Sequence, residues 1–247
     1  MRYRLLSIGA ALTLATSAAA QQDAAPWKGK NLQYFPADIT REALVQRMRE
    51  FSFALDVRCQ NCHAGGDGLS LEGVDFASDE KPAKLKARAM LRMTDEINNT
   101  LLPKVPSRAE PPVRVECATC HRGVRRPKSL QTTLFEVIAR DGVPAAIKRY
   151  RDLREATALL GKYNFGEWEI NELARRLVEA KNAEAAIAIL ELNGEFYPKS
   201  AEIDFMIAEL HRERGERDKA LARYKKTLEK APNHQRARVR LAELEKQ

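Results

Sequence analysis

The four cysteines of this 247-residue chain fall into two copies of one pattern, CQNCH at residues 59–63 and CATCH at residues 117–121. Two cysteines three apart on one helical turn point to the same side. There, each sulfur can add to one vinyl group of a porphyrin while the adjacent histidine reaches the iron. The pattern is the attachment motif of haem c. We therefore predict two covalently bound haems c, held by Cys59, Cys62, His63, Cys117, Cys120 and His121.

Paired cysteines have three other common uses, and each explains less of the pattern. Two disulfides are common in small secreted chains, but neither they nor a thioredoxin-like redox pair requires a histidine directly after the second cysteine. A redox pair also needs a βαβ setting that the sequence does not suggest. A four-thiolate zinc site would leave His63 and His121 unused, and its two halves would lie more than fifty residues apart.

The first twenty residues predict export. Arg2 and Arg4 precede an apolar stretch over residues 5–15, and three alanines end at Ala20, as in a cleaved signal peptide. A membrane anchor would need about 18 to 20 uninterrupted apolar residues, which this stretch does not reach. We expect cleavage after about Ala20, a periplasmic location, and no membrane span in the mature chain. Haem c is attached after export, which agrees with this expectation.

The composition favours an all-α protein. Hydrophobic residues make up 44% of the chain, charged residues 31% and aromatic residues only 6%, a balance unlike that of β-sandwiches. The formal net charge of +8 includes two arginines of the predicted signal peptide, and the remainder is spread along the chain. Nucleic-acid binding would require a concentrated basic face, so we expect no nucleic-acid partner.

A haem that only transfers electrons usually has a sixth iron ligand, either histidine or methionine. His211 and His234 lie about ninety residues or more beyond the second motif, whereas Met48 lies shortly before the first. Met48 lies on the apolar face of a predicted helix over residues 40–55, which Thr40 would cap. The chain must turn back at residues 56–58 for Met48 to approach the first haem. Packing in the core is the alternative role for Met48.

A second predicted helix covers residues 79–102, with Pro82 near its start and Pro103 just after its end. It carries Met90 and Met93, which are three residues apart and therefore lie close together on the helix surface. Spacing alone leaves open which of the two would bind the second iron.

Three segments of the stretch from about Asn31 to Pro127 carry a family resemblance: NLQYFPADITREALVQRMREFSFALDVRCQNCH, DFASDEKPAKLKARAMLRMTDEIN and VECATCHRG. They resemble the multihaem cytochrome subunit of photosynthetic reaction centres and its shorter relatives in non-photosynthetic bacteria. The resemblance implies that a methionine-bearing helix, a turn and a CxxCH motif hold each methionine-ligated haem. It therefore implies Met48 as the ligand of the first iron and Met90 as that of the second, with Met93 as the alternative.

This chain also departs from the resemblance. The reaction-centre subunit has four such units and is often lipid-anchored, whereas this sequence has two units and no anchoring cysteine. The resemblance therefore implies a free dihaem relative.

The second half of the chain contains an internal repeat. Ala174 and Ala208 are separated by 34 residues, as are Pro198 and Pro232, and this is the period of tetratricopeptide repeats. We expect His211 to be a surface or groove residue of this part. The predicted order of segments is a signal peptide at 1–20, a dihaem cytochrome c domain at 21–129, a helical connector at 130–166, and repeats with a capping helix at 167–247.

Together these features predict an all-α, exported dihaem cytochrome that carries single electrons between redox proteins and is not an enzyme. The short repeat solenoid would bind a peptide or protein partner, or would stabilise the haem domain. The alternatives are a dihaem peroxidase-like enzyme and a haem-based sensor, each of which requires one haem with an open sixth position.

Overall fold

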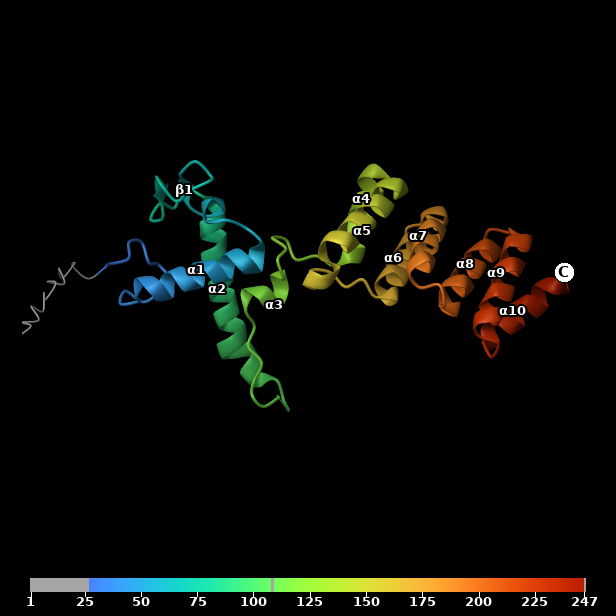
Figure 1. The fold of residues 1–247 in the computed structure, drawn as a ribbon. Coiled ribbons are helices and arrows are strands. Elements are labelled where there is room, and N and C mark those ends of the chain that lie inside the picture. Colours follow the sequence, from blue (N-terminus) through green and yellow to red (C-terminus); the bar gives the residue numbers. More distant parts are fainter. Residues whose placement is uncertain (1–26, 108, 247) are drawn as a thin grey trace, which may run out of the picture.

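The computed structural model describes residues 27–107 and 109–246, so the predicted signal peptide lies outside the described residues. Within them the chain forms ten α-helices and one two-stranded sheet, which confirms the predicted all-α class. Helices α1 (Arg41–Leu55), α2 (Pro82–Glu96) and α3 (Cys117–His121) form one group with the small sheet (Figure 1). The later helices, from α4 (Leu130–Asp141) to α10 (Gln235–Glu245), follow one another in a row towards the C-terminus. In the part of the chain that the structure describes, no helix is both long and apolar enough to cross a membrane.

The first helix and the turn after it follow local sequence signals. Helix α1 (Arg41–Leu55) begins at Thr40, whose hydroxyl accepts a hydrogen bond from the amide of Ala43 at 3.2 Å. It ends at Asp56, whose φ of 53° reverses the chain direction. The predicted helix and turn are therefore confirmed. The turn leads into a short 3₁₀ helix, η1 (Cys59–Asn61), at the first CxxCH motif.

A hairpin follows the first motif. Strand β1 (Ala64–Gly65) pairs antiparallel with β2 (Val74–Asp75), and Ala64 lies opposite Asp75. Gly65 has a φ of +76°, and a Cβ at this position would collide with the carbonyl oxygen of Gly73. Glycine at residue 65 thus allows the hairpin to close tightly beside His63.

Helix α2 (Pro82–Glu96) starts with proline in its first turn and continues through a π-helical turn, η2 (Ile97–Leu101), and a 3₁₀ turn, η3 (Leu102–Lys104). The sequence predicted a start at residue 79. The helix begins three residues later because the side chain of Asp79 instead binds Arg88 and Asn31. The second CxxCH motif forms a short helix of its own, α3 (Cys117–His121).

The remaining helices share two apolar cores. The larger core includes Leu134 of α4, Tyr150 of α5 and Ile189 of α7, all fully buried. The predicted connector therefore packs into the same core as the helices that follow it. The smaller core joins the last three helices through Phe205 and Tyr224. The bounds are α4 (Leu130–Asp141), α5 (Val143–Thr157), η4 (Ala158–Leu160), α6 (Glu167–Glu179), α7 (Ala183–Phe196), α8 (Ala201–Glu213), α9 (Arg217–Lys230) and α10 (Gln235–Glu245).

Candidate haem-binding site

The first CxxCH motif is held between the hairpin and the start of α2. The amide of His63 donates to the carbonyl of Cys59 at 3.0 Å, which closes the motif into a single turn. From the N-cap of α2, the Lys81 ammonium donates to the carbonyl of Gln60 at 3.0 Å. The backbone of the motif is therefore closed into a turn and tied to the start of α2.

The His63 imidazole lies against the ring of Phe76, with the two ring centroids 5.0 Å apart. Its Nδ1 atom is buried and has no hydrogen-bond partner among the described residues. Burial, and next the nearby Lys84 ammonium, lower the pKa of His63. The ring is thus kept in the neutral form, which is the form that binds a metal ion.

The second motif presents its histidine in the manner of a metal ligand. Nδ1 of His121 lies 2.9 Å from the carbonyl oxygen of Val124, a contact that selects the tautomer in which Nδ1 carries the proton. Nε2 then keeps its lone pair for a metal, as is usual when a backbone carbonyl holds the other nitrogen. Burial raises the pKa of the Cys117 thiol, which keeps the sulfur protonated.

Helix α2 and the turn that continues it are bonded to the first motif and to the segment just before the second motif. Lys81 holds Gln60 at one end, while at the other the Asn98 side chain donates to the carbonyl of Val115 at 2.8 Å and accepts from its amide at 2.7 Å. The two attachment points are about 25 Å apart at about 1.5 Å per residue. The separation of the two motifs is therefore linked to the length of this helix.

The three candidate methionines lie on α1 and α2. Met48 is half-buried on α1. This helix packs against α3, and the contact includes the carbonyl of Ala54, which accepts from the amide of Gly123 at 2.8 Å. At about 100° per residue, Met48 lies about 120° around α1 from Ala54. Met48 therefore lies on a different side of α1 from Ala54, which is the buried residue of this helix.

Met90 and Met93 are 41% and 44% exposed on α2. Met90 lies about 200° around the helix from Arg88, which is the buried residue of α2. The two methionines consequently lie on the side of α2 away from the contacts that Arg88 makes with the N-terminal segment.

The described residues before Leu130 bury little apolar surface of their own. Ala54 and Ala64 are the apolar residues buried there, while larger apolar side chains are exposed in the same part of the chain. These include Phe53, Phe76, Leu85, Met90, Met93 and Leu101. Accessible apolar side chains, four thiols and two oriented imidazoles match what a porphyrin with a covalent attachment requires. The residues present therefore fit haem c.

Sequence reasoning missed the polar residues that support the motifs. Lys81, Lys84 and Arg88 hold the first motif and its loop, and Asn98 holds the segment before the second motif. A signal was present, because Lys81, Lys84 and Arg88 recur at the spacing of one helical face. Helical spacing alone does not reveal which segment such a face contacts.

Comparison with known proteins supports haem binding by this part of the chain. The family described as "Photosynthetic reaction centre cytochrome C subunit" matches residues 17–158, more than half of the chain. The chain belongs to this family. The match includes both CxxCH motifs and runs past the end of α5. The family resemblance inferred from the sequence is thereby confirmed.

A shorter match links this reaction-centre cytochrome family member to "Cytochrome c-554" of Chloroflexus aurantiacus. The two are 38% identical over 80 residues, which is 32% of this chain and 16% of the relative. The match thus spans about a sixth of the relative's length. Membership of the cytochrome family implies covalently bound haem c, electron transfer and redox protein partners, and it favours an electron carrier over an enzyme.

Proposed function

We propose that the protein is a dihaem c-type cytochrome that carries single electrons between exported redox proteins. The observation that carries this proposal is the presence of two complete CxxCH motifs in a part of the chain with little apolar core of its own. The first motif is bonded to the N-cap of α2, and the segment just before the second is bonded to η2. Haem c would supply one-electron iron chemistry when bound. The chain would supply attachment, axial ligands and spacing.

The proposed ligands are the residues of the two CxxCH motifs and the methionines that the family resemblance implies. Cys59, Cys62 and His63 would hold the first haem, and Cys117, Cys120 and His121 the second. Met48 is the proposed sixth ligand at the first site and Met90 at the second, with Met93 as the alternative to Met90. A thioether ligand favours the reduced iron and raises the reduction potential. With both axial positions filled, the protein side chains exclude substrates from the metal.

The experiment is an absorption spectrum of protein matured in a haem c-competent host, oxidised and then reduced, with a haem count per chain and carbon monoxide added to the reduced form. The expected result is two covalent haems with no carbon monoxide response. One haem that binds carbon monoxide would contradict the carrier function and would support the peroxidase-like enzyme or the sensor. One haem per chain would contradict the dihaem assignment.

The proposed function also includes export of the chain to the periplasm. Residues 1–20 have the pattern of a cleaved signal peptide. Mass spectrometry of protein recovered from the periplasm should give a mature chain that starts at about Gln21 and carries the haem mass. Recovery of an uncleaved chain in a membrane fraction would contradict it.

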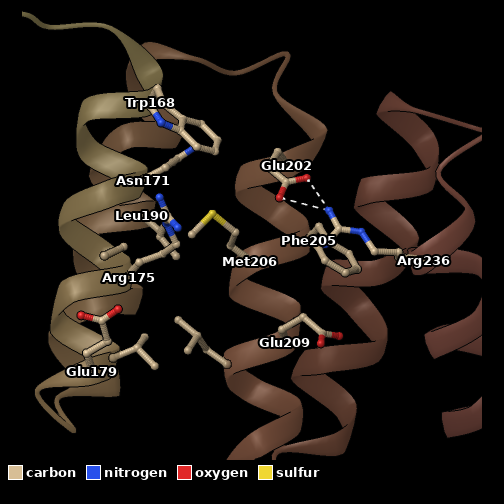
Figure 2. Close-up of a pocket in the computed structure, with 13 residues that line it drawn as sticks. Trp168, Asn171, Arg175, Glu179, Leu190, Glu202, Phe205, Met206, Glu209 and Arg236 are labelled. Carbon is tan, nitrogen blue, oxygen red and sulfur yellow. Dashed lines mark hydrogen bonds and ion pairs between the residues drawn. The ribbon is translucent and has the colours of Figure 1, made fainter.

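The proposed domains are 21–129 for the haems, 130–166 for the connector and 167–247 for tetratricopeptide-like repeats that bind a protein partner. A groove of about 560 Å³ between α6, α8 and α10 supports the binding role (Figure 2). Trp168 is 66% exposed at this groove, with the Arg175 guanidinium 5.4 Å from its ring. Opposite, Arg236 lies 4.5 Å from the ring of Phe205 and 3.3 Å from Glu202.

Crosslinking in periplasmic extract tests this role. Trp168→Ala should reduce crosslinking to a partner without changing the haem spectrum, whereas Val239→Ala, another exposed apolar residue outside the groove, should leave it unchanged. Equal crosslinking by wild type and Trp168→Ala would assign the repeats a stabilising role instead.

A further inference from the structure

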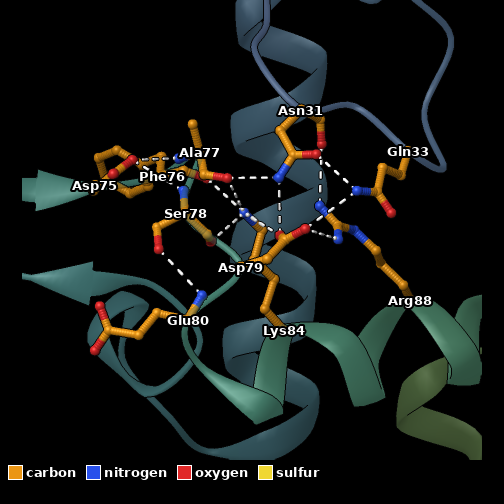
Figure 3. A network of polar contacts seen from close by, with 10 residues as sticks. All are labelled: Asn31, Gln33, Asp75, Phe76, Ala77, Ser78, Asp79, Glu80, Lys84 and Arg88. Atoms are coloured by element: carbon orange, nitrogen blue, oxygen red, sulfur yellow. Dashed lines mark hydrogen bonds and ion pairs between the residues drawn. The ribbon is translucent and has the colours of Figure 1, made fainter.

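The ammonium group of Lys84, on α2, forms hydrogen bonds mainly with backbone carbonyl oxygens. Its ammonium donates to the carbonyl oxygens of Phe76, Ala77 and Ser78 at 3.0, 3.0 and 2.7 Å, and it lies 3.2 Å from a carboxylate oxygen of Asp79 (Figure 3). Its side chain is 11% exposed. A single charged group therefore gathers the carbonyls of one loop onto the helix through strong, charge-assisted hydrogen bonds.

Arg88 reinforces this loop one turn further along α2. Its guanidinium donates to Asp79 at 2.9 Å and to the carbonyl of Asn31 at 3.1 Å. The Asn31 side chain in turn donates to the carbonyl of Ala77 at 2.6 Å and to Asp79 at 2.9 Å. The loop is thus held by the helix and by the N-terminal segment together, and it has little freedom to shift.

The loop that Lys84 and Arg88 hold includes Phe76, whose ring contacts the ring of His63. Lys84 binds the carbonyl of Phe76, and the Phe76 ring lies 5.0 Å from the His63 ring at an interplanar angle of 59°. Among the described residues, Nδ1 of His63 has no hydrogen-bond partner that would fix the ring. His121, by contrast, is fixed by Val124. Contact with Phe76, whose ring packs on the imidazole and whose backbone also acts on it as a hydrogen-bond partner, is therefore what can set the orientation of His63.

We propose that Lys84 is a positioning residue for the first haem site, because it anchors Phe76 against His63. This inference rests on the proposed function, since it assigns His63 to a haem iron. The two proposed haem sites then differ in the contact that orients the histidine. The backbone of Val124, three residues after the histidine, orients it at the second site, whereas Phe76, on a loop that Lys84 holds, orients it at the first.

The test compares Lys84→Met, Phe76→Leu and the double variant in the full chain with its haems. The readout is the electron paramagnetic resonance spectrum of each ferric haem, whose g-values depend on the orientation of the axial imidazole. We expect both single variants to change the g-values of the same haem and the double variant to change them no further than Phe76→Leu alone, since coupled residues are not additive. Lys84→Met should also lower the reduction equilibrium constant of that haem by roughly tenfold, because one nearby positive charge is lost.

Lys86→Met is the matched control, since Lys86 is an exposed lysine of the same helix. It should leave both haems unchanged. Unaltered g-values in Lys84→Met, additive effects in the double variant, or equal changes at both haems would overturn the inference.

Two further measurements separate a failure of the proposed role of Lys84 from a variant that does not mature and from a failure of the proposed function. If Lys84→Met fails to mature, Lys84→Arg and Phe76→Leu must still change the same haem, and effects on different haems or on neither would overturn the inference. A wild-type protein without two low-spin haems would contradict the proposed function itself. Two low-spin haems that do not respond to Lys84 would contradict only the role of Lys84.

Discussion

The ammonium of Lys162 lies 2.8 Å from the carboxylate of Asp56, a residue 106 positions earlier in the chain. Asp56 ends α1 just before the first CxxCH motif, and Lys162 follows η4 in the row of later helices. The Lys162 side chain also packs on Gly123, two residues after the second motif. One lysine thus joins the row of helices to the segments that carry both motifs.

Removal of this lysine should loosen the junction. In Lys162→Met we expect faster hydrogen exchange at residues 120–126 and an unchanged haem spectrum, because an exposed ion pair contributes little to global stability but holds a local contact. Lys148→Met, which breaks the exposed Lys148–Asp152 pair within α5, is the control and should leave exchange at 120–126 unaltered. Equal exchange in both variants would show that Lys162 does not hold the junction. The measurement is hydrogen–deuterium exchange by mass spectrometry.

Gly123→Ala should destabilise the protein for two reasons. The φ of Gly123 is +77°, and an added Cβ would lie 2.9 Å from Cε of Lys162. We expect the free energy of unfolding to fall by about 1–3 kcal/mol, measured by urea denaturation of the haem-loaded protein. Gly68→Ala separates the two causes, because Gly68 has a φ of +81° with no atom within 4 Å of the added Cβ. A loss in Gly68→Ala as large as that in Gly123→Ala would assign the whole effect to backbone strain.

Asn98 should be needed for the second site. Asn98→Ala leaves the part-buried amide and carbonyl of Val115 without their partners, at a cost of up to about 1–3 kcal/mol for each group. We expect fewer than two haems per chain, measured by the pyridine haemochrome assay. Asn99→Ala, at the exposed neighbouring position, should keep the full count. A full count in Asn98→Ala would show that α2 does not support the second motif.

Met90 and Met93 can be separated directly. Met90→Leu should weaken the far-red iron-to-methionine band and make one haem reactive to carbon monoxide, whereas Met93→Leu should keep the band, because leucine preserves packing but offers no sulfur. The reverse outcome would assign the ligand to Met93. Absorption spectroscopy of the oxidised and reduced proteins decides between them.

Asp204 should make stability depend on pH. Burial alone would raise the pKa of this carboxyl, but Lys230 at 2.5 Å and Arg223 at 2.8 Å outweigh burial and lower it. The folded pKa thus lies below the unfolded value of about 3.8, so the stabilisation is complete above that value and is lost as the pH falls through the folded pKa. Asp204→Asn should cost about 2 kcal/mol at pH 7 and reduce the loss of stability on acidification, measured by urea denaturation at several pH values. An unchanged pH profile in Asp204→Asn would show that another carboxyl is responsible.

Local signals in the sequence predicted much of the haem-motif region. Thr40 at the start of α1, the turn at Asp56 and Pro82 at the start of α2 are each decided by neighbouring residues, so they could be read from the sequence. Contacts between distant segments could not, and they include the packing of α1 on α3 and the hold of Lys84 on the loop around Phe76.

The expectation for His211 was wrong for the same reason. His211 is buried, and its Nδ1 lies 2.6 Å from the Glu216 carboxylate across the turn between α8 and α9. A polar residue type suggested exposure, but a charged partner five residues later allows the histidine to be buried.

Because α2 and the turn that continues it are bonded near a CxxCH motif at each end, they would hold the two proposed haem sites at a fixed separation. Electron exchange within the molecule would then proceed at a constant rate, since tunnelling depends steeply on distance and the helix leaves that distance little room to vary.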